Sequence, residues 1–119
     1  MYDVFIKRRS KLNLSVVYST ENEQDNLDFY YHNLNCEIID VVNYSPDIAI
    51  IIDDEGFLKS GQPIYELTDS KGNKMRLAGT LLFAQSHYDN GEVTLKGLSK
   101  SQAFHIMTNM KIKMLGFTN

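Results

Sequence analysis

The chain has 119 residues, of which 43% are hydrophobic and 23% are charged, and its formal net charge is −3. These values are typical of one folded globular domain and exclude a disordered or fibrous chain. Charged residues stand where a signal peptide would be apolar, and no apolar run approaches the roughly 18 residues that span a membrane. Because Cys36 is the only cysteine, no internal disulfide is possible, and we expect a cytoplasmic protein.

The first 26 residues predict a β-hairpin followed by an acidic loop. Apolar and β-branched residues alternate over residues 2–7 and recur over 12–18, which indicates two strands. Residues 19–26 contain no apolar side chain, so we expect a solvated loop there. We treat residues 1–26 as an N-terminal segment and residues 27–119 as an α+β domain. We expect the two to form one compact unit.

The middle of the chain predicts a short helix and two strands. The helix covers residues 27–34, and its apolar residues share one face at helical spacing: Leu27, Tyr30, Tyr31 and Leu34. Residues 37–42 and 47–52 read as strands, and the second is apolar enough to lie in the centre of a sheet. Residues 53–56 then predict a turn that ends in Gly56.

The second half of the chain predicts further strands and a second helix. Residues 63–67 and 75–84 have strand character, and Asn90-Gly91 suits the two-residue turn of a hairpin. Ser99 and Gln102 predict a capping box for a helix over residues 100–110. The core face of this helix is predicted to contain Ala103, Phe104, Met107 and Met110. Residues 111–117 return as a last strand or cover the sheet, so the fold class is α+β, mostly antiparallel, with one or two packed helices.

Charge is divided unevenly along the chain. The 47 residues from Leu12 to Leu58 contain ten carboxylates and no Lys or Arg, whereas residues 1–11 carry +3 and residues 59–119 carry +4. Such a block produces a one-sided field that favours a cationic partner, such as the nucleic-acid groove of another protein. The alternative is a solvated face that the later Lys and Arg residues balance in three dimensions.

The expected binding residues combine carboxylates of this block with two tyrosines. Tyrosine beside carboxylates suits an interface that contacts both the stems and the charged heads of Lys or Arg. Packing in the protein core would equally explain the apolar character of Tyr30 or Tyr31. The predicted partner-binding residues are Asp53, Asp54, Glu55, Glu37, Asp40, Tyr30 and Tyr31.

No residue pattern indicates an enzyme. His32 and Cys36 stand four apart, the minimum for a thiol and a base on one helix face, but no third group orients the histidine. His87 and His105 lack metal-ligand spacing, and the run from Asp53 to Glu55 lacks the spacing of a calcium loop. Phosphate-binding and nucleophile-elbow motifs do not occur. We therefore expect neither catalysis nor a metal or cofactor.

From Tyr30 onward the chain resembles a known but uncharacterised family. The resemblance is carried by residues 30–42, 47–58, 77–84 and 90–92, ahead of the helix start at Leu98-Ser99. The family is a domain of unknown function found in phages, plasmids and conjugative elements of Gram-positive bacteria. The resemblance implies an accessory protein that acts inside a bacterial host, and it supplies no catalytic residues. Residues 1–26 look unlike this family.

Small acidic proteins of mobile elements often counter host defence, and this analogy sets the functional expectation. We expect non-enzymatic inhibition of a nucleic-acid-acting defence complex, in particular an anti-CRISPR protein whose acidic surface occupies a basic channel. The expected partner is a host defence protein such as a CRISPR effector nuclease, without direct contact to nucleic acid or membrane.

Two other functions fit parts of the sequence. A small-molecule binder, such as a protein that sequesters a nucleotide signal, would use glycine loops and nearby cations. Its residues would be Gly56, Gly79, Gly91, Lys74 and Arg76. A DNA-binding regulator would instead use the cations of the first turn, Lys7, Arg8, Arg9 and Lys11.

Overall fold

A hairpin opens the fold in the computed structural model, which describes residues 2–10, 13–20 and 27–119. Strands β1 (Tyr2–Arg8) and β2 (Leu14–Thr20) pair antiparallel, which confirms the predicted hairpin. Strand β2 continues through Ser19, which we had assigned to the loop. Ser19 is buried and lies opposite Asp3 in the ladder, so cross-strand pairing overrides its polar character. The remainder of the predicted acidic loop, residues 21–26, lies outside the described residues.

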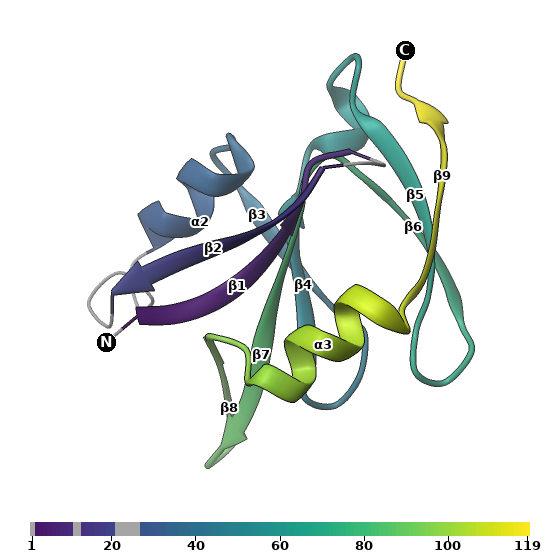
Figure 1. The fold of residues 1–119 in the computed structure, drawn as a ribbon. Helices are drawn as coiled ribbons and strands as arrows, with labels where there is room; N and C mark the ends of the chain where they lie inside the picture. The colour runs from purple at the N-terminus through teal and green to yellow at the C-terminus, as the bar shows by residue number, and fades with distance from the viewer. Residues whose placement is uncertain (1, 11–12, 21–26) are drawn as a thin grey trace.

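The hairpin forms part of a six-stranded antiparallel sheet (Figure 1). The other strands are β3 (Ile39–Asn43), β4 (Ile48–Asp53), β7 (Leu81–Asp89) and β8 (Glu92–Lys96). Their order is β2-β1-β7-β4-β3, and β8 pairs with the second half of β7. All residues of β4 are buried, which confirms its predicted central place. Asn90 and Gly91 both have positive φ in the β7–β8 turn, as an Asn-Gly hairpin requires.

A second, three-stranded sheet contains the C-terminal strand. Its order is β6 (Lys74–Ala78), β5 (Pro63–Thr68) and β9 (Lys111–Phe117), so residues 111–117 do return as a last strand. A short 3-10 turn, η1 (Gly56–Leu58), connects the two sheets between β4 and β5. A Cβ on Gly56 would lie 2.3 Å from the carbonyl oxygen of Ala78, so only glycine allows this close approach.

The helix α2 (Leu27–Leu34) has the bounds that the sequence predicted. Asn35 follows with φ of 52°, and the N–H groups of Asn35 and Cys36 donate to the carbonyls of His32 and Tyr31. These two bonds form a Schellman motif that ends the helix. Cys36 therefore lies beyond the helix, and the proposed shared helix face with His32 does not exist.

The helix α3 (Lys100–Thr108) begins with the predicted capping box. The N–H of Gln102 donates to Ser99 Oγ at 3.1 Å, and the N–H of Ser99 donates to Gln102 Oε1 at 2.8 Å. The predicted core face was partly wrong, because Phe104 and Met107 are exposed while Gln102 and Ile106 are buried. Gln102 Nε2 also donates to the carboxylate of Asp47 at 3.1 Å, so Gln102 and Ile106, four residues apart, share the buried face of the helix.

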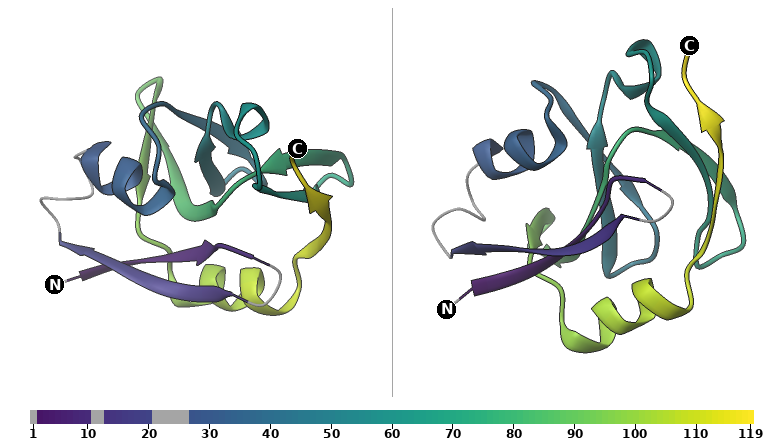
Figure 2. Two further views of the ribbon diagram at one scale, coloured as in Figure 1. Left: turned by 90° about the horizontal axis from the view of Figure 1, so that it is seen from above. Right: turned by 45° about the horizontal axis from the view of Figure 1, so that its top comes forward.

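Two cores lie on opposite faces of the large sheet (Figure 2). One face packs against the small sheet and α3, and residues such as Ile50, Phe83 and Tyr65 fill that space. The other face packs against α2, with Phe5, Tyr30 and Leu82 in contact. The sequence prediction of an α+β fold in one domain, mostly antiparallel, is confirmed. In the described part of the chain, no helix has the length and apolar character needed to cross a membrane.

Candidate functional site

A mixed acidic and apolar surface forms where β4 ends. The backbone N–H of Asp54 donates to the carbonyl of Ile38 at 3.0 Å, so the segment before β3 lies against the segment after β4. Glu37 and Glu55 line one hollow there, together with Cys36 and other neighbours. We call this surface the acidic edge, and we define it by Glu37, Ile38, Asp54, Glu55, Phe57 and Leu58.

The carboxylates of the acidic edge are exposed to solvent. Among the described residues, Glu37, Asp54 and Glu55 form no salt bridge. Three large apolar side chains of the same segments are exposed as well, namely Leu58 at 82%, Phe57 at 54% and Ile38 at 50%. The sequence analysis identified the carboxylates and missed the apolar residues. The Phe57-Leu58 pair directly after a charged turn is the signal in the sequence that could have indicated them.

Asp53 is a correction to the predicted site, because its side chain is only 7% exposed. Its Oδ2 atom lies 2.6 Å from Lys59 Nζ, and its Oδ1 accepts the N–H of Glu55 at 2.9 Å. The side-chain hydrogen bond with Asp53 raises the pKa of Lys59. Asp53 therefore holds the turn that presents Asp54 and Glu55, and it is not available to lead a contact.

Tyr30 is a second correction, because it is buried in the core under α2. Its ring lies 6.2 Å from that of Phe5 in an edge-on arrangement. Tyr31 is half-buried on the same helix. Asp40 is exposed on β3, where its Oδ1 accepts the N–H of Val41 at 2.9 Å. Of the seven predicted residues, the structure brings Glu37, Asp54 and Glu55 together at one exposed place.

Cys36 is half-buried between the acidic edge and the core under α2. Burial, followed by the charge of Asp53, raises the pKa of its thiol. The thiol is the unreactive protonated form at neutral pH, because nucleophilic cysteines need a lowered pKa. In the residues that the structure describes, no group of three or more His, Cys, Asp or Glu side chains could hold a metal ion.

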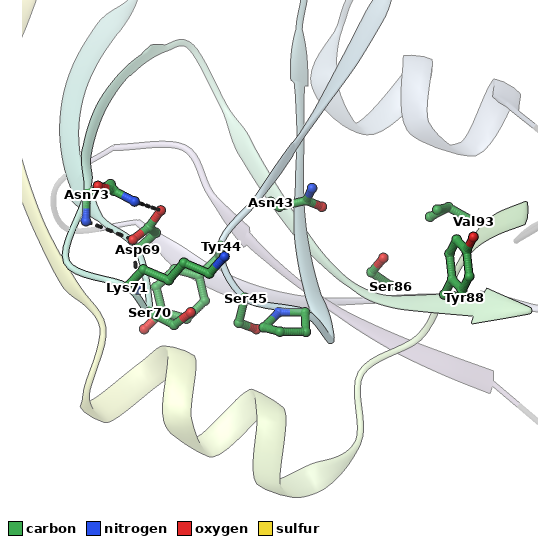
Figure 3. Close-up of a pocket in the computed structure, with 11 residues that line it drawn as sticks. Asn43, Tyr44, Ser45, Asp69, Ser70, Lys71, Asn73, Ser86, Tyr88 and Val93 are labelled. Atoms are coloured by element: carbon green, nitrogen blue, oxygen red, sulfur yellow. Dashed lines mark hydrogen bonds between the residues drawn. The ribbon is translucent and has the colours of Figure 1, made fainter. Parts of the chain in front are cut away.

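A separate polar pocket of about 380 Å³ lies between the β3–β4 turn, the β5–β6 turn and β7 (Figure 3). Asp69 accepts the backbone N–H groups of Asn73 and Lys71 at 2.9 Å each, and the bond from Asn73 is the main cause of its lowered pKa. The Tyr44 hydroxyl is bonded to His105 Nε2 at 2.9 Å. These polar groups are engaged in holding turns and a helix, so the pocket presents no activated nucleophile.

The residues of the small-molecule alternative do not converge on one place. Lys74 and Arg76 lie 3.6 and 3.8 Å from the carboxylate of Glu66 on the small sheet. Gly56 is packed against Ala78, and Gly91 lies in the exposed β7–β8 turn. None of the pockets found in the described part of the chain is lined by these glycines.

The cations of the DNA-binding alternative are separated by strand alternation. Lys7 and Arg9 line a pocket on the α2 face of the large sheet, whereas Arg8 lies beside Tyr65 on the opposite face. Lys11 lies outside the described residues. The first turn therefore does not present Lys7, Arg8 and Arg9 as one basic surface.

Comparison with known proteins finds one family. Residues 11–110 match the model of a family described as a domain of unknown function (DUF3846). The match begins well before Tyr30, so part of the N-terminal hairpin belongs to the family pattern, which corrects the expectation that residues 1–26 stand apart. No curated protein and no solved structure gives a significant match.

Proposed function

This chain belongs to the DUF3846 family, and we propose that it is a non-enzymatic protein that inhibits a nucleic-acid-acting defence complex of a bacterial host. In this proposal it is an anti-CRISPR protein carried by a phage, plasmid or conjugative element. Its acidic edge occupies a basic channel that otherwise holds nucleic acid. The observation that carries the proposal is the combination of exposed carboxylates and exposed apolar side chains at that edge.

The composition of the acidic edge resembles that of protein interfaces. Interfaces place apolar anchors in the centre, where water is excluded, and polar or charged groups at the rim. Phe57 and Leu58 supply apolar area, and Glu37, Asp54 and Glu55 supply negative charge without salt-bridge partners among the described residues. A basic groove lined by Lys and Arg would satisfy both, because long cationic side chains also have apolar stems.

The electrostatic part of this binding should depend on salt. Exposed charges are screened over about 8 Å at physiological ionic strength, so attraction to a basic channel weakens as salt rises. The apolar contacts of Phe57 and Leu58 do not weaken in the same way. We therefore expect binding that declines with salt and does not vanish completely.

The first experiment is affinity capture of the tagged protein from a bacterial lysate that contains CRISPR and restriction systems. The captured proteins are identified by mass spectrometry after washes at low and at high salt. We expect enrichment of a nuclease or of its guide-bound complex. Failure to enrich any nucleic-acid-acting protein at either salt concentration contradicts the proposal.

A matched pair of variants tests whether this capture depends on the acidic edge. Glu55→Lys reverses one charge of the acidic edge, and Glu92→Lys makes the same change on the exposed strand β8. We expect Glu55→Lys to weaken capture about 10-fold and Glu92→Lys to leave it unchanged. Equal capture by both variants would assign the interaction to another surface.

A further inference from the structure

A second polar pocket lies at the C-terminal end of α2. It has a volume of about 660 Å³, within the range of small-molecule sites. Its polar lining includes Lys7, Arg9, His32, Asn33, Gln62 and Thr80. We call it the basic pocket.

The strand register explains why cations gather in this pocket. Lys7 of β1 lies opposite Leu82 of β7, and Leu82 lies opposite Ile51 of β4. Because side chains alternate between faces, positions two residues further along each strand share that face. Asp53 occupies such a position at the end of β4, whereas Arg9 directly follows β1 and Thr80 directly precedes β7, and all three line the pocket.

The charges of the basic pocket are not balanced by the protein. Its one carboxylate, Asp53, is paired with Lys59 at 2.6 Å. Among the described residues, the hydrogen-bond partner of Lys7 Nζ is a neutral amide oxygen, Asn33 Oδ1, at 3.4 Å. The side chain of Arg9 forms no hydrogen bond or ion pair with the other residues that the structure describes. Two cations therefore face one cavity without an anionic partner there.

The environment of Lys7 shows the energetic consequence of this arrangement. Burial first, and then the charge of Arg9, lowers the pKa of the Lys7 ammonium. Both causes disfavour the charged form, because the group has lost water and lies near a like charge. An anion bound between Lys7 and Arg9 would favour the charged form of Lys7, because a nearby opposite charge offsets the burial and the repulsion from Arg9.

We propose that the basic pocket binds the phosphate group of a small, polar phosphate monoester, such as a sugar phosphate. Arg9 supplies a planar fork of donors that matches phosphate oxygens, and Lys7 supplies a point charge. The amide of Gln62 and the hydroxyl of Thr80 are donors for the remaining oxygens. The polar lining favours a hydroxyl-rich ligand body over an apolar one.

The two cations of this site, Lys7 and Arg9, do not belong to the acidic edge, although Asp53 and Lys59 line the pocket and also support the turn that presents Asp54 and Glu55. Loss of ligand binding and loss of partner binding can therefore be measured separately. Arg9→Ala should leave capture of the defence complex unchanged, and Glu55→Lys should leave phosphate binding unchanged.

The test is a calorimetric titration of the full chain with ribose 5-phosphate, and separately with inorganic phosphate and with ribose. We expect saturable binding of ribose 5-phosphate, weaker binding of inorganic phosphate and none of ribose. Arg9→Ala should weaken ribose 5-phosphate binding about 10-fold or more, because it removes charged hydrogen bonds. Arg76→Ala removes an exposed cation of the small sheet and should have no effect.

Amide chemical shifts provide a second measurement that does not depend on a folded Arg9→Ala variant. Ribose 5-phosphate should shift the amide resonances of Arg9, Asn33 and Thr80 in the unaltered protein. The proposal is overturned if these resonances do not move at millimolar ligand. Equal binding by the unaltered protein and Arg9→Ala would overturn it as well.

Discussion

At the scale of single residues, the most consequential side chain is the Asp53 carboxylate. It is buried, it pairs with Lys59, and it accepts the N–H of Glu55. These contacts fix the turn between β4 and η1, which carries Asp54 and Glu55 of the acidic edge. Removing the charge of a buried carboxylate with such partners lowers the free energy of unfolding, because the partners are left unsatisfied.

Asp53→Asn keeps the side-chain shape and removes the charge. We expect the free energy of unfolding to fall by about 1–3 kcal/mol, since Lys59 loses its ion pair. The measurement is urea unfolding followed by circular dichroism. Asp54→Asn changes the exposed neighbour and should remain within about 0.5 kcal/mol of the unaltered protein. Equal stabilities for the two variants would show that Asp53 does not support the turn.

Asp47 makes stability depend on pH. Hydrogen bonds from Ser45 first, and then from Gln102, lower its pKa below the ordinary 3.8. A carboxyl with a lowered folded-state pKa stabilises the fold above its unfolded pKa, and this contribution is lost as pH falls through the folded pKa. The contribution is small, because Asp47 is largely exposed.

Urea unfolding of the unaltered protein and of Asp47→Asn at about pH 6 and about pH 2 tests this linkage. At the higher pH, we expect the unaltered protein to have a larger free energy of unfolding than Asp47→Asn. The difference should shrink at the lower pH, because the folded-state contribution is lost as pH falls through the lowered pKa of Asp47. If the difference in stability between the two proteins is the same at both pH values, the charge of Asp47 does not contribute to stability.

At the scale of elements, α3 depends on its N-terminal cap. Ser99 and Gln102 bond reciprocally, and Gln102 also reaches Asp47 in the β3–β4 turn. The cap therefore fixes both the start of the helix and its position against the sheet. Ser99→Ala should lower the free energy of unfolding by about 1 kcal/mol, the usual effect of losing such a cap. Lys100→Ala, at the exposed first helical position, is the control and should have little effect.

The small sheet has a charge cluster on adjacent strands. Glu66 of β5 is 14% exposed and lies within 3.6 to 3.8 Å of Lys74, Arg76 and Lys113. Glu66→Gln would leave three cations side by side. We expect a loss of about 1 kcal/mol at low salt that diminishes at high salt, because the repulsion is screened. Unfolding curves at two salt concentrations measure this change in the free energy of unfolding. A change that is the same at both salt concentrations would contradict this explanation.

At the scale of the whole molecule, periodicity predicted most elements but not how they pack. The continuous apolar run of β4 and the helical spacing of α2 are local properties, so the sequence located both elements correctly. Tyr30, Asp53 and Phe104 were misplaced because their exposure depends on neighbours that are distant in sequence. Phe5 packs against Tyr30, Lys59 pairs with Asp53, and Gln102 of α3 bonds to Asp47 of the β3–β4 turn. The basic pocket was not predictable either, since it requires the register between β1, β7 and β4.

The fold also redistributes the acidic block that the sequence predicted. Asp53 is neutralised by Lys59, and Asp47 is tied to Ser45 and Gln102. Among the described residues of the block, Glu37, Asp54 and Glu55 remain exposed together at the acidic edge. The proposed binding surface is therefore smaller than the acidic block, and it includes the exposed apolar residues beside these carboxylates.

The most direct test of the central claim is a competition measurement on the nuclease complex that the protein captures. Labelled target DNA is bound to the complex, and its fluorescence anisotropy is followed as the unaltered protein, Glu55→Lys or Glu92→Lys is added. The account predicts that the unaltered protein and Glu92→Lys displace the DNA, less effectively as salt rises, and that Glu55→Lys requires about 10-fold more protein. Undisturbed DNA binding at saturating protein, or equal displacement by both variants, would contradict it.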